Sequence, residues 1–307
     1  MSETQAQQLR VAMKSAVTRG IGFLDTAVVE SGAWPCESYG SCPDADDRPP
    51  FLAAAGALAL EASGDQRVRN VLASTREFLM SRIEPPGLWR WAPFNLDVDS
   101  TCLCALALGP QFHPELFMGR NVEHILSNRD TEGRFLTWMS ASGPFGSPND
   151  ADPVVNANVV TYLGDRADTR PAQRWVERVV SDGRGGAGLS LWYGPPMDLY
   201  YCVSRAANVA APVFKELKPI LTERILGDQT DNALSIAQAL CSLDMLGAKV
   251  HSDFVHQRAK RLISMQQSCG SWPACVVCQT PAGVCVFYSQ TLTTAYCIEA
   301  LSRLIRN

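Results

Sequence analysis

The stretch Arg261-Leu262-Ile263-Ser264-Met265-Gln266-Gln267-Ser268-Cys269-Gly270-Ser271-Trp272 joins an amphipathic segment to a glycine and a tryptophan, and this combination recurs along the chain. Similar glycine–tryptophan pairs occur at four earlier places: Gly32 with Trp34, Gly87 with Trp89, Gly133 with Trp138, and Gly188 with Trp192. Successive tryptophans are 55, 49, 54 and 80 residues apart. The longest gap contains further helical segments, so we expect a sixth, shorter unit within it. Six units of about 50 residues then account for the chain.

Each unit combines an amphipathic helix, a glycine-containing turn and a more apolar helix. The amphipathic helices are expected to begin near these residues: Gln5, Gln66, Glu115, Pro171, Val213 and Ser252. The apolar segments cover residues 51–60, 101–108, 154–163, 199–211, 233–246 and 292–304. Because a helix that is apolar on all sides is buried on all sides, the alternation predicts an all-α fold. We expect a single α6/α6 toroid, a double ring of about twelve helices, filling residues 1–307 as one domain of six helix-pair repeats.

Composition restricts the classes of function. The 307 residues are 46% hydrophobic and 19% charged, with 27 Lys and Arg against 31 Asp and Glu, for a net charge of -4. A dedicated nucleic-acid binder normally carries a basic stripe, so no nucleic-acid partner is expected. The chain has no run of 18 apolar residues and its first residues are polar, so we expect no stable membrane insertion and a cytoplasmic location.

Eleven cysteines are present, and four of them crowd near one another at Cys269, Cys275, Cys278 and Cys285. Four thiolates can bind zinc, but only one CxxC pair occurs here and no histidine lies nearby. We therefore expect reduced thiols packed in a loop and predict no metal site. The other cysteines of the apolar segments are interpreted as small buried side chains.

The stretch 261–272 resembles the QW motif of the terpene cyclase and protein prenyltransferase superfamily. Residues 20–35 contain a weaker copy, and Leu292-Thr293-Thr294-Ala295-Tyr296-Cys297-Ile298-Glu299-Ala300-Leu301 is similar to the inner helix that follows such a motif. The resemblance spans the chain and also implies an α/α toroid. The local reason for the motif is that glycine allows a tight exit from the outer helix, while tryptophan fills the gap between neighbouring units.

The segment Asn95-Leu96-Asp97-Val98-Asp99-Ser100-Thr101-Cys102 opens the most apolar inner helix. It resembles the DxDD-type segment of class II terpene cyclases, which protonate an alkene or epoxide. The resemblance implies that Asp99 is the proton donor and Asp97 its acidic partner, while Ser100 departs from the family by replacing the last Asp. Burial and a neighbouring carboxylate raise the pKa of an aspartate, whereas a helix N-terminus lowers it. The alternative is that both residues cap the helix and support it.

Further aspartates stand where other inner helices begin. Asp44-Ala45-Asp46-Asp47 matches DxDD literally, but Arg48-Pro49-Pro50 follows at once, which indicates an exposed loop. This loop could help to hold Mg²⁺ if the substrate carries a diphosphate. Asp152 precedes Pro153 and fits a helix N-cap. Asn156 and Asn158 follow one turn later, and as buried amides they need hydrogen-bond partners, so they could orient Asp99 or bind a polar substrate group.

Aromatic side chains near the starts of inner helices are the candidate walls of a pocket, because π faces stabilise a carbocation much as they stabilise an ammonium ion. Packing in the turns between repeats is the alternative, which we prefer for Trp34, Trp89 and Trp272. The predicted substrate-binding set combines aromatic and polar residues: Trp91, Phe94, Trp138, Asp152, Asn156, Trp192, Tyr200, Tyr201 and Tyr288, with Tyr193 beside them.

The sequence favours a terpene cyclase-like enzyme, an isomerase or lyase, that protonates an isoprenoid or prenylated small molecule. Its cavity would lie within the ring or between subunits of a homo-oligomer. A prenyltransferase-like zinc set cannot be assembled, because no histidine lies on a late inner helix. Two alternatives stay open: a carbohydrate-active α6/α6 barrel with Asp99 and Asp152 as paired carboxylates, and a non-catalytic toroid that binds a prenyl lipid or a partner. The position of the Asp99 carboxyl distinguishes the cyclase from the binding toroid. A carboxyl that faces an enclosed, aromatic-lined cavity favours the cyclase, whereas one that caps a helix in solvent favours the binding toroid.

Overall fold

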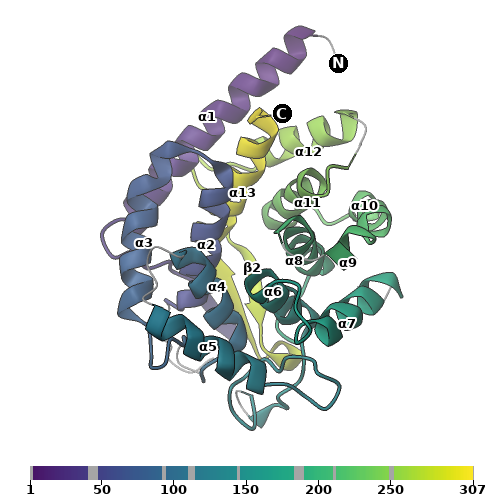
Figure 1. Cartoon of the computed structure of the whole chain (residues 1–307). Helices are drawn as coiled ribbons and strands as arrows, with labels where there is room; N and C mark the ends of the chain where they lie inside the picture. The colour runs from purple at the N-terminus through teal and green to yellow at the C-terminus, as the bar shows by residue number, and fades with distance from the viewer. Residues whose placement is uncertain are drawn as a thin grey trace.

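Apolar helices form a closed inner ring in the computed structural model, which describes residues 3–40, 48–91, 95–109, 115–143, 146–182, 190–209, 212–248 and 252–306 (Figure 1). The inner helices are α2 (Pro50–Ser63), α4 (Val98–Leu108), α6 (Pro153–Leu163), α8 (Pro196–Val209), α11 (Ala233–Met245) and α13 (Gln290–Arg306). Each contacts the next in this order, and α13 contacts α2, which closes the ring. Their sequences are apolar on most sides because neighbours surround them.

The outer helices alternate with the inner ones along the chain. They are α1 (Glu3–Val28), α3 (Arg69–Ser81), α5 (Glu115–Ser127), α7 (Arg170–Ser181), the short α9 (Pro212–Lys215) followed by α10 (Lys218–Gly227), and α12 (Ser252–Ser264). α3 shows the amphipathic pattern, since its buried side chains are Val71, Leu72, Thr75, Phe78 and Leu79. The predicted toroid of alternating inner and outer helices is confirmed.

The tryptophan turns pack between neighbouring units. Trp272 is fully buried, its indole N–H donates to the Leu262 carbonyl of α12 at 2.6 Å, and its backbone N–H donates to Thr294 of α13. Gly270 has a φ of +95°, and a Cβ there would lie 2.4 Å from the Arg19 carbonyl oxygen. Only glycine satisfies both constraints. Trp34 and Trp89 are equally buried, so the packing interpretation of these three tryptophans is confirmed.

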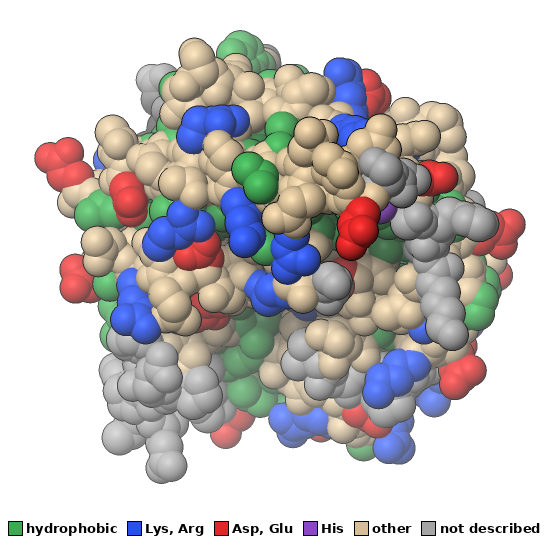
Figure 2. Space-filling view, turned by 90° about the horizontal axis from the view of Figure 1, so that it is seen from above, with side chains coloured by type: hydrophobic (Ala, Val, Ile, Leu, Met, Phe, Trp, Pro, Cys, Tyr) green, Lys and Arg blue, Asp and Glu red, His purple; other side chains and the backbone are tan. Residues whose placement is uncertain are grey.

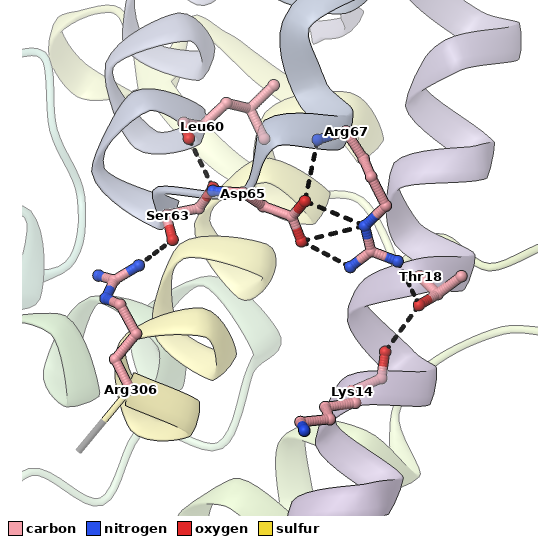
Figure 3. A network of polar contacts seen from close by, with 7 residues as sticks. All are labelled: Lys14, Thr18, Leu60, Ser63, Asp65, Arg67 and Arg306. Atoms are coloured by element: carbon pink, nitrogen blue, oxygen red, sulfur yellow. Dashed lines mark hydrogen bonds and ion pairs between the residues drawn. The ribbon is translucent and has the colours of Figure 1, made fainter.

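The first and last units are joined by side chains from three helices (Figure 3). Asp65 accepts hydrogen bonds from Arg67, whose guanidinium also donates to Thr18 of α1 at 2.6 Å. Arg306, at the end of α13, donates to the Ala62 and Ser63 carbonyls at the end of α2. A cation at a helix C-terminus satisfies free carbonyls and opposes the helix dipole, so these contacts help to close the ring.

A small antiparallel sheet departs from the all-helical prediction. Strands β1 (Glu37–Gly40), β2 (Cys275–Gln279) and β3 (Cys285–Ser289) have the order β1-β3-β2. The sequence predicted a loop of reduced thiols here, but β2 and β3 form a hairpin of β-branched and aromatic residues. Cys285 is disulfide-bonded, which corrects the reduced-thiol prediction for it, whereas Cys275 and Cys278 are free.

The surface of the protein mixes charges of both signs. On the face in Figure 2, acidic and basic side chains are interspersed, with several basic ones near the middle. Some pair locally, as Arg261 does with Asp231 at 2.6 Å. Within the part of the chain that the structure describes, no helix is long and apolar enough to cross a membrane.

Candidate active site

A hollow with about 40 Å³ of free space lies where inner helices begin, and the sheet forms part of its wall. Aromatic side chains dominate its lining, so we call it the aromatic hollow. Its lining residues are Phe51, Trp91, Asp97, Asp99, Thr137, Trp138, Val155, Trp192, Tyr193, Cys278, Gln279, Thr280 and Phe287. The rings contact one another: the centroids of Trp138 and Trp192 are 5.1 Å apart, and those of Trp91 and Phe287 are 5.4 Å apart. The aspartates are therefore the acidic groups in a largely apolar lining.

Asp97 is the N-cap of α4. Its Oδ1 accepts a hydrogen bond from the Ser100 backbone N–H at 2.6 Å, while its Oδ2 has no hydrogen-bond partner among the described residues. Only 3% of Asp97 is exposed. Burial is the main reason that the pKa of Asp97 is raised to about 7, and the nearby Asp99 adds to the shift. This carboxyl can therefore hold a proton near neutral pH.

Asp99 lies in the first turn of α4 and is equally buried. Its Oδ1 accepts a hydrogen bond from the Asn158 side-chain amide at 2.7 Å, and its Oδ2 accepts one from the Tyr193 hydroxyl. Burial raises the pKa of Asp99, while the hydrogen bonds from Tyr193 and Asn158 oppose that rise. Asp99 can thus hold a proton in the resting site and still be stabilised as a carboxylate after losing it.

Arg205 orients the amide that contacts Asp99. Its guanidinium Nη2 donates to Asn158 Oδ1 at 2.6 Å. With that oxygen occupied, the Asn158 amino group faces Asp99. The charge of Arg205 also lowers the pKa of Asp99. An arginine suits this position because its guanidinium stays charged when buried.

Asp152 holds the turn that carries Tyr193. One oxygen of Asp152 caps α6 by accepting from the Val154 backbone N–H at 2.8 Å. The other accepts from the Ser190 hydroxyl at 2.5 Å and the Leu191 backbone N–H at 3.1 Å. Ser190 Oγ in turn accepts from the Tyr193 backbone N–H at 2.8 Å. Burial is the main reason that the pKa of Asp152 is raised to about 6.

The residues predicted from the sequence separate into two groups. Asp97, Asp99, Trp91, Trp138 and Trp192 line the aromatic hollow, and their roles stay predictions. The remaining described members of the predicted set are absent from the lining: Asp152, Asn156, Tyr200, Tyr201 and Tyr288.

The second group has contacts elsewhere in the structure. Asn156 exchanges hydrogen bonds with the Phe135 backbone at 2.9 Å, and Tyr201 donates to Glu299 at 2.9 Å. Tyr288 packs edge-on against Tyr39. These residues were predicted from their position near helix starts, which does not fix the direction of a side chain. Phe94, Asp44, Asp46 and Asp47 lie outside the described residues.

Sequence reasoning missed several groups at the site. Arg205 lies inside an apolar helix, so nothing local pairs it with Asn158. Phe51 was interpreted only as part of an apolar run. Gln279 and Phe287 reach the aromatic hollow from the unpredicted hairpin. Alternation in Cys285–Ser289, where Cys285, Phe287 and Ser289 are buried, was the available signal.

Chemically suitable metal ligands do not cluster in the described part of the chain. No group of three or more His, Cys, Asp or Glu side chains there is placed to hold a metal ion. The arrangement instead supports proton chemistry, since it pairs buried carboxyls with oriented hydrogen-bond donors beside an apolar hollow.

No protein-family model matches the chain. The chain is 26% identical over 217 residues to drimenol cyclase DrtB from Aspergillus calidoustus, an alignment that includes 68% of this chain and 38% of the relative. The chain therefore spans about two fifths of the length of that curated protein.

Solved structures share the fold. The type II terpene cyclase MstE from Scytonema superposes with a TM-score of 0.78 at 16% identity, covering 97% of this chain and 99% of MstE. MstE has also been solved with geranylgeranyl dihydroxybenzoate as substrate and with merosterolic acid A as product. An α-amylase from Clostridium perfringens matches with a TM-score of 0.58 at 8% identity, over 94% of this chain and 97% of that chain. The α/α toroid of type II terpene cyclases is thus the fold of this protein.

Proposed function

We propose that the protein is a type II terpene cyclase-like enzyme that protonates an isoprenoid alkene. Asp99 is the general acid, and the aromatic walls shield the carbocation that forms. One observation carries this proposal: Asp99 is buried beside the aromatic hollow with both carboxyl oxygens held by oriented donors. The similarity to drimenol cyclase and the shared fold of MstE support the same reaction type.

In this proposal the acidic proton lies on Asp99 Oδ2. Asn158 occupies a lone pair of Asp99 Oδ1, and Tyr193 occupies one lone pair of Oδ2. The remaining lone pair of Oδ2 can carry the proton that is delivered. The π electrons of the alkene form the new C–H bond, the Asp99 O–H bond breaks, and the positive charge appears on the other alkene carbon. Cyclisation or rearrangement ends when the cation loses a proton or adds water.

Three side chains support the proposed acid in a chain where Ser100 replaces the last Asp of the DxDD motif. In place of a third acidic neighbour, this chain surrounds Asp99 with Tyr193, Asn158 and, behind Asn158, Arg205. All three favour the carboxylate that remains after proton transfer. Preorganised donors aimed at charge that develops in the transition state are commonly the largest contribution to catalysis.

The aromatic hollow supplies the environment that the cation needs. Phe51, Trp91, Trp138, Trp192 and Phe287 present rings rather than nucleophiles to it. A cation over a desolvated aromatic face is stabilised by about 2 kcal/mol or more. The rings also exclude water, which would otherwise trap the cation early.

We propose a prenylated small molecule as the substrate class. MstE binds a geranylgeranyl dihydroxybenzoate, and the name of the curated relative indicates a drimane alcohol. The protonation step itself uses no metal. If the substrate carries a diphosphate, Mg²⁺ would accompany that group, as the sequence suggested. The reaction would be an isomerisation when all atoms are retained and a lyase reaction when diphosphate leaves.

Two alternatives predict different behaviour. A carbohydrate-active barrel would need Asp152 as a second catalytic carboxylate, but Asp152 does not line the aromatic hollow. A non-catalytic lipid-binding toroid would bind prenyl compounds without converting them. The enclosed position of Asp99 favours the cyclase, because a binding toroid has no need for a buried acid.

The test is product formation from farnesyl diphosphate, geranylgeranyl diphosphate and geranylgeranyl dihydroxybenzoate, followed by mass spectrometry. In D₂O, a product started by protonation gains one deuterium. Asp99→Asn is expected to abolish product formation, while the exposed Asp231→Asn serves as the matched control. Conversion by Asp99→Asn at the wild-type rate, or binding of all three compounds without conversion, would contradict the proposal.

A further inference from the structure

A second hollow, with about 20 Å³ of free space, lies behind the partners of Asp99. We call it the polar chamber, because its wall combines apolar side chains with six polar ones: Asn158, Tyr193, Asp198, Arg205, Gln238 and Tyr296. It shares only Phe51 and Tyr193 with the aromatic hollow. The two donors to Asp99 therefore border the polar chamber, whereas Asp99 itself borders the aromatic hollow.

Unsatisfied polar atoms surround the polar chamber. Asp198 Oδ1 accepts a hydrogen bond from the Gln238 amide at 2.7 Å. Asp198 Oδ2, Gln238 Oε1 and Arg205 Nε are buried and have no partner among the described residues. Leaving a buried polar group unpaired costs about 1–3 kcal/mol. The free space of about 20 Å³ is large enough for about one water molecule, which these polar groups could bind.

Asp198 does not behave as an ordinary helix cap. It lies in the first turn of α8 and only 4% of it is exposed. Neither of its oxygens accepts a backbone N–H among the described residues, in contrast to Asp97 and Asp152. Burial is the main reason that the pKa of Asp198 is raised to about 7, with a contribution from Asp152. This carboxyl can carry a proton at neutral pH.

The chemistry creates a need for such a group. Each turnover takes a proton from Asp99, and substrate or product fills the aromatic hollow on that side. A replacement proton then has to arrive through the partners of Asp99. The Asn158 amide can donate a hydrogen bond but does not readily pass a proton on, whereas the Tyr193 hydroxyl can give one proton and accept another.

We propose that Asp198 and the water of the polar chamber reload Asp99 through the Tyr193 hydroxyl. The Tyr193 O–H bond breaks as its proton moves to Asp99 Oδ2, and the Tyr193 oxygen accepts a proton from water. The new Asp99 O–H then turns about its C–O bond to the lone pair that delivers the proton, and Tyr193 again donates to Oδ2. That water takes the proton of Asp198 Oδ2, and the Asp198 carboxylate recovers a proton from solvent. One proton moves in total, and no charge stays on Tyr193. This inference rests on the proposed function.

Isotope labelling of the first product tests the relay. Enzyme equilibrated in H₂O is mixed into D₂O, and after a variable delay a limiting amount of the prenyl substrate is added, so that each molecule turns over at most once. The deuterium in the product then reports how fast the proton of Asp99 exchanges with solvent. Asp198→Asn is expected to slow this exchange by about 10-fold or more, and to lower steady-state turnover while the single-turnover rate stays near wild type.

Two further variants make the result specific. Gln238→Leu retains Asp198 but removes a ligand of the water, so it should slow labelling in the same direction. Asp244→Asn removes a carboxyl that pairs with Arg303 at 2.8 Å on the same inner ring, and it should label at the wild-type rate. Thermal unfolding of each variant establishes that it is folded.

The outcomes separate the relay from the proposed function. If Asp99→Asn still converts substrate, the proposed function is wrong. If Asp99→Asn is inactive while Asp198→Asn matches the wild type in both labelling and steady-state turnover, the function stands and the relay is overturned.

Discussion

Tyr193→Phe is the change that most directly tests how the strength of the acid is set. The substitution removes a hydroxyl that donates to Asp99 Oδ2 and keeps the ring beside Phe51, whose centroid is 6.2 Å away. A hydrogen bond to a charged group contributes about 1.5–3 kcal/mol. Since about 1.36 kcal/mol corresponds to a tenfold change in rate, the rate of protonation should fall about 10- to 150-fold.

The pH dependence of Tyr193→Phe has a predictable sign. Asp99 must be protonated to act, so activity is lost as pH rises through its pKa. The Tyr193 hydrogen bond lowers the pKa of Asp99, and removing it raises that pKa. The alkaline limit of activity should therefore move to higher pH, although the rate at lower pH falls.

Single-turnover kinetics with enzyme in excess separates this effect from proton reloading, because only the first protonation is observed. The assay quenches the reaction at intervals, quantifies product by mass spectrometry, and repeats the series from acid to alkaline buffers. Tyr162→Phe is the matched control, since its hydroxyl bonds Asn121 at 3.0 Å and does not border the aromatic hollow. A Tyr193→Phe rate within twofold of wild type, or an alkaline limit displaced to lower pH, would refute the reasoning.

Three other changes test separate parts of the structure. Arg205→Met should reduce kcat by about 10-fold or more with little change in KM, because Arg205 orients Asn158 without bordering the aromatic hollow; steady-state kinetics measures this. Gly270→Ala should destabilise the fold by about 1–2 kcal/mol or more in denaturant unfolding. Position 270 has a positive φ, which an alanine adopts only with strain, and the added Cβ would meet the Arg19 carbonyl. Gly22→Ala, with open space around it, should be neutral or stabilising. The pKa of Asp198 is raised from 3.8 to about 7 in the folded protein, so the contribution of this group to native stability should fall as pH rises from about 4 to 7. Asp198→Asn should therefore unfold at a higher temperature than wild type at alkaline pH. Equal unfolding temperatures there would contradict this prediction.

Much of the fold could be predicted because burial leaves a pattern in the sequence. The expected segments 51–60 and 154–163 correspond to α2 (Pro50–Ser63) and α6 (Pro153–Leu163). An inner helix of a toroid has neighbours on every side, so its apolar composition is unmistakable. The glycine and tryptophan of each turn add a second, independent signal.

The pairing of the strands in the sheet could not be predicted from the sequence. β1 (Glu37–Gly40) pairs with β3 (Cys285–Ser289), nearly the whole chain away. Segments of four or five residues carry little periodic information, and their pairing is decided only once the ring has closed. Phe287 and Gln279 reached the site by this route, so they were missed.

The candidate site was predictable only where its signal is local. Asp97 and Asp99 stand in one motif. Asn158 was expected to orient Asp99 or to bind a polar substrate group, and it donates a hydrogen bond to Asp99 at 2.7 Å. Arg205 comes from a different helix, α8, and Tyr193 from the turn before it. Their convergence on Asp99 follows from the packing of α4, α6 and α8 as neighbours in the ring, which no single segment of sequence encodes.

The two neighbouring carboxyls have different surroundings, and this difference assigns the charge. Asp97 has one oxygen without a partner and a pKa of about 7, so an added negative charge on it is poorly stabilised. Asp99 has donors on both oxygens and the charge of Arg205 behind Asn158. In the proposed reaction, the negative charge that remains after proton transfer is therefore better placed on Asp99 than on Asp97. Titratable groups whose environments push their pKa values apart divide acid and supporting roles in this way, and here the division depends on Tyr193 and Asn158 rather than on a third carboxylate at Ser100.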